Sequence, residues 1–307
     1  MSSKELDRAN ATWRALSPAH GMPVGEVRRR VEDFYAQFPA IEDARVDRVN
    51  AGGVPALWIA TPQSSAERVI LYLHGGGYAL GSARAYQEMT TRMARAARAQ
   101  VVVPDYRLAP ENRFPAAVED ATAAYRWLLS RGVAPASIAI AGDSAGGGLT
   151  LATMLALRYA SEPLPAAAVC ISPWIDLELT GETIETKAAA DALVTREGLE
   201  QFVEWYLAGQ DPRLPLASPL HADLHGLPPL LIQVGTAEIL LDDARRIAHR
   251  AREAGVVVTL EEFEEMPHVW HVFASFLPEG QRAIDALGAF VRENATPRSQ
   301  GASIPLQ

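Results

Sequence analysis

The chain has 307 residues, of which 49% are hydrophobic and 21% are charged. These proportions resemble those of ordinary globular proteins, so they exclude a disordered, collagen-like or membrane-spanning chain. The formal net charge of −9 disfavours nucleic-acid and anionic-membrane partners, because both surfaces would repel an acidic protein.

The first 43 residues have the apolar periodicity of helices, with Val27, Val31 and Phe34 on one face. Pro18 and Pro23 are expected to divide this segment into at least two pieces. The dense basic run at residues 28–30 is expected to be a solvated helix face. The first residues lack the apolar stretch of a secretory signal, so we expect a cytoplasmic protein.

From residue 44 onward the pattern changes to short extended runs that alternate with helical ones. Residues 44–49 and 54–61, separated by two glycines, predict a β-hairpin. Further strands are expected at 68–73, 100–104, 137–142, 166–171, 229–235 and 256–263, with helices at 83–99, 114–131, 144–159, 241–254 and 279–293. This alternation predicts an α/β fold with a mainly parallel sheet covered by helices on both faces.

Residues 176–216 interrupt the alternation with helical character. Together with residues 1–43 they are expected to form a cap over the carboxyl ends of the strands, where ligands bind in such sheets. We therefore expect one domain, with a catalytic core at 44–175 and 217–294 and a flexible tail at 295–307.

A single cysteine, Cys170, limits the chemistry that the chain can use. It excludes an intrachain disulfide and a cysteine metal cluster. Because its neighbours predict a buried strand, we expect an inert side chain and no thiol catalysis.

The motif Gly-Asp-Ser-Ala-Gly-Gly at residues 142–147 lies between an expected strand and an expected helix. A nucleophile on such a sharp turn needs small neighbours, because the backbone brings adjacent side chains into contact. The turn also places Ser144 at a helix N-terminus, where a developing negative charge is stabilised. We therefore predict that Ser144 is a nucleophile.

A second motif, His-Gly-Gly-Gly-Tyr at residues 74–78, directly follows another expected strand. Three glycines in a row weaken regular structure, so we expect them to allow a close approach of the backbone. An oxyanion hole is such a use, in which a loop of this kind adds N–H donors to that of the residue after the nucleophile. His74 is expected to hold the loop and not to act in catalysis.

The general base and its acid are expected later in the chain, because nucleophiles on such turns are followed by the acid and then by the histidine. His268 is the preferred base, since it follows the last strand through a proline turn; His271 is the alternative. Glu238 lies directly past the strand at 229–235 and is the preferred acid. Asp242, a few residues farther on, remains an alternative that could instead cap the next helix.

The chain resembles the bacterial hormone-sensitive-lipase family (family IV) of esterases, which have the α/β-hydrolase fold. The resemblance rests on residues 74–78, 104–111, 114–116 and 142–147 and on the loops around Glu238 and His268, and it covers about residues 45–293. It implies an eight-stranded core, a helical cap, and hydrolysis of short-chain acyl esters without a metal or cofactor. Glu238 departs from the pattern, because most of these enzymes have an aspartate there.

The resemblance also implies roles for individual positions. Gly76, Gly77 and Ala145 correspond to the oxyanion donors, and Gly75 to a supporting residue. The segment at residues 105–107 is expected to brace the sheet near this loop. Residues that could line a substrate pocket are Tyr78, Asp143, Trp174, Phe202, Trp205, Tyr206, Leu207 and Trp270.

Other functions remain open. Lactone, carbamate or amide hydrolysis would use the same site, and a hydrolase-like scaffold can also serve as a non-catalytic ligand receptor. The expected partner is a small-molecule ester, with no nucleic acid or membrane. The resemblance suggests a homodimer, formed through the strand near residues 256–260.

Overall fold

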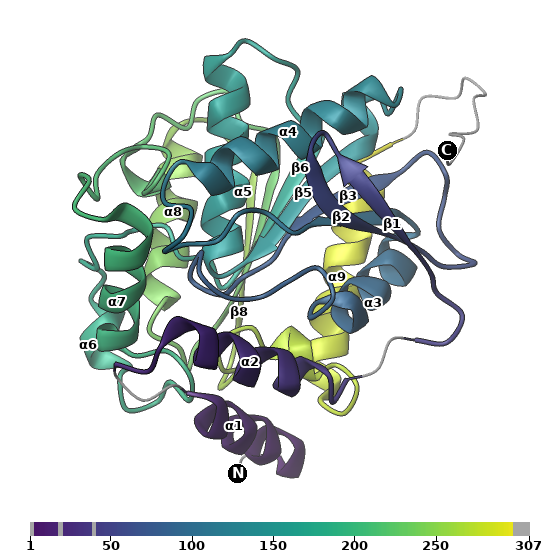
Figure 1. The fold of residues 1–307 in the computed structure, drawn as a ribbon. Coiled ribbons are helices and arrows are strands. Elements are labelled where there is room, and N and C mark those ends of the chain that lie inside the picture. Colours follow the sequence, from purple (N-terminus) through teal and green to yellow (C-terminus); the bar gives the residue numbers. More distant parts are fainter. Residues whose placement is uncertain (1–2, 18–20, 39–40, 297–307) are drawn as a thin grey trace.

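The fold is seen in a computed structural model that describes residues 3–17, 21–38 and 41–296. Residues 297–307, most of the expected tail, lie outside the described part of the chain, as does Pro18. One sheet of eight strands has the order β1-β2-β4-β3-β5-β6-β7-β8 (Figure 1). The strands are β1 (Arg45–Ala51), β2 (Val54–Ala60), β3 (Val69–Leu73), β4 (Gln100–Pro104), β5 (Ile138–Asp143), β6 (Ala167–Ile171), β7 (Leu230–Gly235) and β8 (Val258–Phe263).

The sheet is mixed only at one edge. Strand β2 runs antiparallel to both β1 and β4, whereas β4, β3, β5, β6, β7 and β8 are parallel. The eight strands expected from the sequence are all present, and the hairpin at the N-terminal edge is confirmed.

Helices cover both faces of this sheet. The helices are α1 (Lys4–Leu16), α2 (Val24–Tyr35), α3 (Gln87–Ala97), α4 (Ala116–Ser130), α5 (Ala145–Tyr159), α6 (Thr183–Thr186), α7 (Arg196–Leu207), α8 (Leu241–Glu253) and α9 (Pro278–Asn294), with short 3₁₀ turns at Pro135–Ser137, Pro219–His221 and Trp270–Phe273. Figure 1 shows α3 and α9 together on one face and α4, α5 and α8 on the other. The doubly covered sheet predicted from the alternation of elements is therefore confirmed.

Helix α3 begins later than the predicted residue 83. The hydroxyl of Ser82 accepts a hydrogen bond of 3.1 Å from the Ala85 N–H, and Asp105 Oδ1 accepts one of 2.6 Å from the Ala83 N–H. These side chains hold residues 82–86 in turns, so they compete with the helix for backbone donors.

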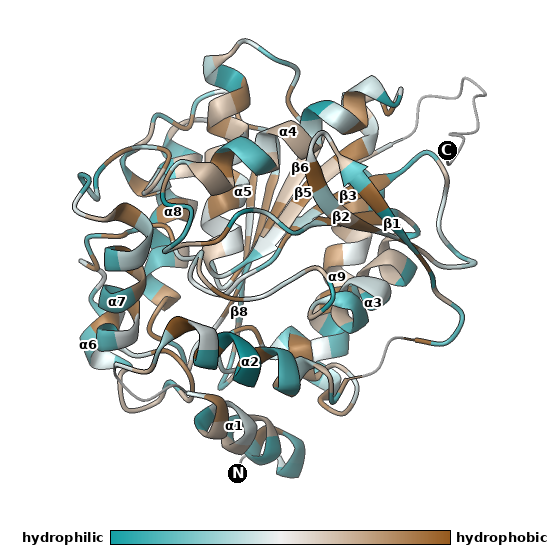
Figure 2. Cartoon of the chain, viewed as in Figure 1, coloured by the Kyte–Doolittle hydropathy of each residue, from teal (hydrophilic) through white to brown (hydrophobic). Residues whose placement is uncertain are grey.

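The core lies on both sides of the central strands. On β3, Val69, Leu71 and Leu73 join the hydrophobic cluster beneath α4, α5 and α8. Ile70 and Tyr72 point the other way, into the cluster that contains α3 and α9. Each of these side chains is fully buried, and burial of one large apolar side chain contributes about 1.5–3 kcal/mol. Figure 2 shows the corresponding concentration of hydrophobic residues along the inner strands.

Helices α1, α2, α6 and α7 gather at one end of the sheet, at the lower left of Figure 1. In the basic run at residues 28–30, Arg29 is exposed as predicted, but Arg28 on α2 is not solvated, which corrects the prediction for that residue. Its Nε donates to the Ala79 oxygen and its Nη2 to the Ala109 oxygen, both at 2.8 Å, and it also forms an ion pair with Glu111. The arginine therefore fastens α2 to loops of the core.

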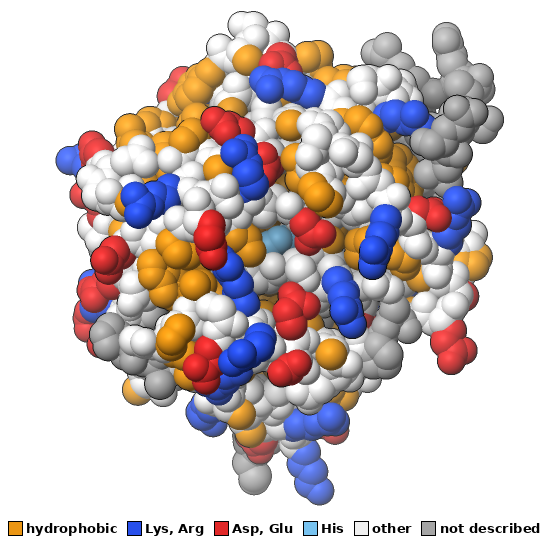
Figure 3. Space-filling model, in the orientation of Figure 1, with side chains coloured by type: hydrophobic (Ala, Val, Ile, Leu, Met, Phe, Trp, Pro, Cys, Tyr) orange, Lys and Arg blue, Asp and Glu red, His pale blue; other side chains and the backbone are white. Residues whose placement is uncertain are grey.

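Over the face shown in Figure 3, acidic and basic side chains are interspersed. No helix among the described residues combines the length and the apolar character needed to cross a bilayer.

Candidate active site

Ser144 occupies a strained turn between β5 and α5. Its φ of 53° and ψ of −122° are unusual for a residue with a side chain. A Cβ at Gly142 would lie 2.2 Å from the Gly146 oxygen, and a Cβ at Gly146 would lie 2.0 Å from the Leu73 oxygen. Only glycine fits at both positions, so the motif is a steric requirement of the turn that exposes the serine.

The glycine-rich loop lies beside this turn. Gly76 and Gly77 have φ angles of 109° and 61°, which L side chains rarely adopt. Within the described residues, the backbone N–H groups of Gly76, Gly77 and Ala145 donate no hydrogen bond to the protein. Two of these residues line the same cavity as Ser144, and Ala145 directly follows the serine. The three N–H groups are therefore available to an oxyanion formed next to Ser144.

Asp143 fixes the glycine loop. Its Oδ1 accepts hydrogen bonds from the Gly75 N–H at 2.9 Å and the Tyr72 hydroxyl at 2.7 Å, and its Oδ2 accepts one from the Tyr86 hydroxyl at 3.0 Å. Burial raises the pKa of Asp143 to about 6, against the opposing effect of these hydrogen bonds. Asp143 does line the cavity, but both of its oxygens are bound by the protein, so its contacts are those of a support for the loop.

His74 and Tyr106 support the loop from behind. The two rings stack with centroids 4.2 Å apart, and the Tyr106 hydroxyl donates to the His74 oxygen at 2.7 Å. Burial lowers the pKa of His74, so the ring is neutral, and its Nδ1 lies 2.8 Å from the Gly75 oxygen. These contacts bear out the bracing role that was expected for residues 105–107.

His268 and Glu238 form a buried pair in the loops that follow β8 and β7. His268 Nδ1 lies 2.7 Å from Glu238 Oε2, while Glu238 Oε1 accepts hydrogen bonds of 2.8 Å from both the Ser172 hydroxyl and the Gly235 N–H. Burial lowers the pKa of His268, but the charge and hydrogen bond of Glu238, aided by two further carboxylates, outweigh burial and raise this pKa above its usual value. Because Nδ1 is bound to the carboxylate, Nε2 is the ring nitrogen that remains for proton transfer.

The two alternatives from the sequence make other contacts. Asp242 Oδ2 accepts a hydrogen bond of 3.0 Å from the Glu182 N–H. His271 Nε2 lies 2.9 Å from Gln233 Oε1, and burial lowers the pKa of His271 to about 3. Both side chains serve the packing of neighbouring segments and do not meet Ser144.

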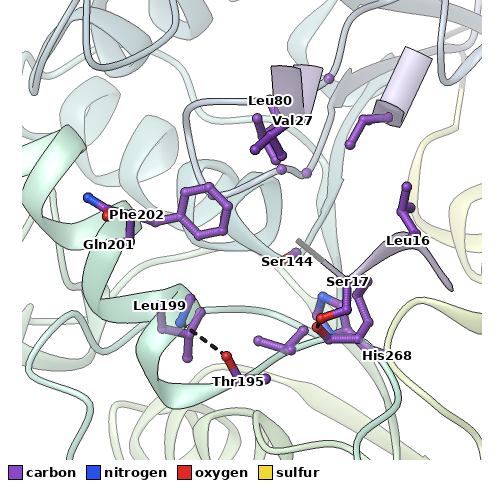
Figure 4. A pocket seen from close by; sticks show the side chains of 18 of the residues that line it. Leu16, Ser17, Val27, Leu80, Ser144, Thr195, Leu199, Gln201, Phe202 and His268 are labelled. Atoms are coloured by element: carbon purple, nitrogen blue, oxygen red, sulfur yellow. Dashed lines mark hydrogen bonds between the residues drawn. The ribbon is translucent and has the colours of Figure 1, made fainter. Parts of the chain in front are cut away.

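Ser144 and His268 line a cavity of about 180 Å3 between helices α1, α2 and α7 and the ends of the central strands. In Figure 4, Phe202 and Leu199 reach toward it from α7, and Val27 and Leu80 close it from the opposite side. Phe202 lies so close to the glycine loop that a Cβ at Gly77 would be 2.5 Å from its ring. The wall is mostly apolar, as a pocket for an acyl or alcohol group requires.

The structure divides the eight residues that were expected to line a pocket. Asp143, Trp174, Phe202 and Trp205 line the cavity. The remaining four, Tyr78, Tyr206, Leu207 and Trp270, lie behind its wall.

Each of these four residues is held by packing. The rings of Tyr78 and Tyr206 stack on each other with centroids 3.9 Å apart, and Leu207 is buried in the core. The Trp270 indole donates to the Glu279 oxygen at 3.2 Å, which turns it toward α9. These aromatic residues thus serve packing and do not line the pocket.

Two side chains that bind the proposed base and acid were not predicted from the sequence. The Trp13 indole N–H donates a hydrogen bond of 2.8 Å to the His268 backbone oxygen. The Ser172 hydroxyl both donates to Glu238 and accepts a hydrogen bond of 3.2 Å from the Val269 N–H. Ser172 directly follows the predicted strand at 166–171. In sheets of this kind ligands bind at the carboxyl ends of the strands, so this position could have indicated that Ser172 belongs to the site.

A group of possible metal ligands lies elsewhere, at Asp176, Glu178 and His221, whose ligand atoms are within 4.8 Å of one another. Asp176 Oδ2 already forms an ion pair of 2.9 Å with Arg246 Nη1, and His221 Nε2 lies 3.0 Å from Glu178 Oε2. Arg246 therefore offsets the charge of Asp176, and Arg213 Nε lies 3.6 Å from Glu178 Oε2.

Comparison with known proteins agrees with this geometry. A family model for the alpha/beta hydrolase fold matches residues 70–272. An acetyl-hydrolase from Streptomyces hygroscopicus is 53% identical over 246 residues, which cover 80% of this chain and 82% of that protein. An esterase from Acinetobacter venetianus is 36% identical over 281 residues, or 91% of this chain and 92% of that protein.

Solved structures are similar along most of the chain. A crystal structure of an esterase from the bacterial hormone-sensitive lipase family matches with a TM-score of 0.94 and 50% identity, covering 96% of this chain and 100% of that one. A crystal structure of the esterase EstE5 soaked with p-nitrophenyl butyrate matches with a TM-score of 0.92 and 43% identity, covering 96% and 99%. The chain therefore belongs to the bacterial hormone-sensitive-lipase family of α/β-hydrolases.

Proposed function

We propose that this chain hydrolyses short-chain carboxylic esters through a covalent acyl-enzyme on Ser144. One observation carries the proposal: His268 lines the same cavity as Ser144, and its Nδ1 lies 2.7 Å from Glu238 Oε2. The relatives named acetyl-hydrolase and esterase support an ester as the substrate.

In the acylation step, Ser144 Oγ attacks the ester carbonyl carbon while His268 Nε2 takes the hydroxyl proton. The carbonyl oxygen becomes negatively charged, and the N–H groups of Gly76, Gly77 and Ala145 are placed to bind it. The carbon–oxygen bond to the alcohol then breaks, and His268 returns the proton to the departing alkoxide. Ser144 is left as an acyl ester.

In the deacylation step, a water molecule attacks the acyl carbon and His268 takes a proton from that water. The second tetrahedral intermediate uses the same three N–H groups. When it collapses, the bond to Ser144 Oγ breaks, His268 reprotonates the serine, and the carboxylic acid leaves. Glu238 exchanges no proton in either step; it holds the imidazole tautomer and stabilises the imidazolium.

The cavity supports a preference for short acyl chains. Its volume is about 180 Å3, and Phe202 stands directly over the glycine loop. We propose that α1, α2, α6 and α7 act as the cap that sets this limit within a single catalytic domain.

A panel of p-nitrophenyl acetate, butyrate, octanoate and palmitate, run beside a matching anilide and a lactone, tests the function. We expect the acetate or butyrate ester to have the highest kcat/KM and the anilide to be poor. Phe202→Ala should move the optimum toward longer chains, because it removes the ring above Gly77. A preference of the native enzyme for palmitate, or for the anilide or lactone over every ester, would refute this function.

We also propose a homodimer formed through β8, and a cytoplasmic location. The dimer is supported by the position of β8 at the edge of the sheet, with Val257 beside it 71% exposed. Light scattering of the purified chain tests the dimer, and cell fractionation tests the location. A monomeric mass at working concentration would contradict the former.

A further inference from the structure

Asp191 belongs to the cap insertion between β6 and β7, yet its carboxylate binds the loop of the proposed acid. Oδ2 accepts a hydrogen bond of 2.9 Å from the Ile239 N–H, and Ile239 directly follows Glu238. Oδ1 accepts hydrogen bonds from the N–H groups of Leu193 and Val194, at 2.9 and 2.8 Å. One side chain therefore ties together a turn of the cavity wall and the backbone of the acid loop.

This contact closes a ring of links between the cap and the proposed triad. The Ser17 hydroxyl donates to the Leu193 oxygen at 3.2 Å, which joins the end of α1 to the same turn. Trp13, also on α1, donates to the His268 oxygen, and His268 in turn binds Glu238. The cap insertion, α1, the base loop and the acid loop thus hold one another in place.

A glutamate at the acid position makes such support necessary. Glutamate has one more rotatable bond than aspartate, so fixing its carboxylate costs more side-chain entropy. Ser172 and the Gly235 N–H fix the carboxylate of Glu238 itself. Asp191 fixes the backbone at the next residue, a point that neither of those groups reaches.

The charge of Asp191 also acts on His268. Burial raises the pKa of Asp191 overall, although the proximity of His268 and the hydrogen bonds from the backbone N–H groups of Leu193, Val194 and Ile239 lower it. The carboxylates whose charge raises the pKa of His268 are Glu238, Asp191 and Asp143. A negative charge at Asp191 therefore favours the protonated ring that forms during each proton transfer.

We propose that Asp191 is a positioning residue that couples the seating of the cap to the orientation of Glu238, and whose charge stabilises the imidazolium of His268. The proposal rests on the function proposed above. Asp191 touches neither substrate nor reacting atoms, so its effect must pass through Glu238 and His268.

The test compares Asp191→Asn with Asp211→Asn in the full chain. Asp211 is a matched control from the same insertion, where its Oδ1 accepts a hydrogen bond of 2.9 Å from the Arg213 N–H. With p-nitrophenyl acetate, we expect Asp191→Asn to lower kcat by about ten- to hundredfold, as small misplacements of a catalytic group do, with a smaller change in KM. The acid limb of its pH profile for kcat/KM should move to lower pH, because His268 loses a stabilising charge. Asp211→Asn should keep the native kcat and pH profile.

A second variant, Asp191→Glu, separates charge from geometry. It keeps the negative charge but misplaces the carboxylate, so the acid limb should stay at the native pH while kcat falls; this variant carries the test if Asp191→Asn does not fold. A native kcat and acid limb in Asp191→Asn, or a loss of thermal stability alone, overturns the proposal, as does a native kcat in Asp191→Glu. Failure of the Asp191 proposal can be distinguished from failure of the proposed function, because the latter would appear as ester turnover by Ser144→Ala.

Discussion

The indole N–H of Trp13 donates a hydrogen bond of 2.8 Å to the backbone oxygen of His268, so the first helix of the chain holds the loop of the proposed base. The Trp13 ring is buried against Phe34 and Phe273, with centroids 5.0 and 4.7 Å away. Helix α1 therefore contacts the loop of the proposed base and also contributes Trp13 and Leu16 to the wall of the cavity.

Trp13→Phe is expected to lower kcat about tenfold while keeping most of the ring packing. The change leaves the His268 oxygen buried without its donor, a loss that costs about 1–3 kcal/mol. The control is Trp58→Phe on β2, where the indole donates to Gln100 away from the cavity. That variant should lose stability and retain its kcat. Steady-state kinetics and thermal melts of both variants check the prediction, and a native kcat in Trp13→Phe would contradict it.

The link between Trp13 and His268 also marks the limit of what the sequence could predict. The two residues are 255 positions apart, and a buried tryptophan in a helix carries no sign of its distant partner. The Ser144 turn, in contrast, was predictable because the glycines of its motif lie next to the serine in the sequence, and a Cβ at Gly142 would lie 2.2 Å from the oxygen of Gly146 in the same motif. The strands and helices were predictable for a similar reason, because the spacing of hydrophobic residues and the short apolar runs that indicate them are local properties of the sequence.

Other failures of prediction have the same physical origin. Arg28 was expected to be solvated because charged runs usually are, but its guanidinium satisfies backbone oxygens of loops that follow much later in the chain. Trp270 and Tyr206 were expected at the pocket, but the direction of an aromatic side chain depends on packing that composition does not encode. Asp191 stands alone among apolar residues at 188–194, and nothing in that segment indicates its contact with the distant Ile239 N–H.

Glu238→Gln is expected to reduce kcat by roughly 10⁴-fold, because the amide no longer holds the imidazole in the required tautomer. Asp242→Asn is the matched control, since Asp242 instead accepts a hydrogen bond from the Glu182 N–H. It should lose about 1 kcal/mol of stability at most and keep its turnover. Kinetics at saturating p-nitrophenyl acetate decide between the two acids. If Asp242→Asn loses its kcat while Glu238→Gln stays active, Asp242 and not Glu238 is the acid that orients His268.

The pH profile of kcat/KM should have its acid limb above about 6.5, the ordinary pKa of histidine. Although burial lowers the pKa of His268, Glu238 and the two neighbouring carboxylates raise it overall, and the base must be neutral to act. The raised pKa of His268 also determines how the stability of the protein depends on pH. The stabilisation from protonated His268 is fully present below its unfolded pKa and is lost as pH rises through the raised folded pKa. Rate profiles and urea titrations across this range check both statements, and an acid limb below 6.5 would contradict them.

Esters that carry a carboxylate are expected to be poor substrates. The charged side chains of the described cavity lining are those of Asp143, Glu197 and His268, with no lysine or arginine among them. Repulsion between like charges should lower kcat/KM for p-nitrophenyl hemisuccinate about tenfold or more relative to the butyrate at low salt. Glu197→Gln should narrow this gap, whereas equal rates for the two esters in the native enzyme would contradict the prediction.

The most direct test of the proposed acyl-enzyme mechanism is to identify the residue that becomes covalently modified. We expect incubation with a p-nitrophenyl phosphonate to add one phosphonyl group, which intact mass and peptide mapping should place on Ser144, with activity lost in proportion to labelling. Ser144→Ala should take up no label and should lose at least about 10⁴-fold in kcat. A label on another residue, or ester turnover by Ser144→Ala near the native rate, would contradict the assignment of Ser144 as the nucleophile.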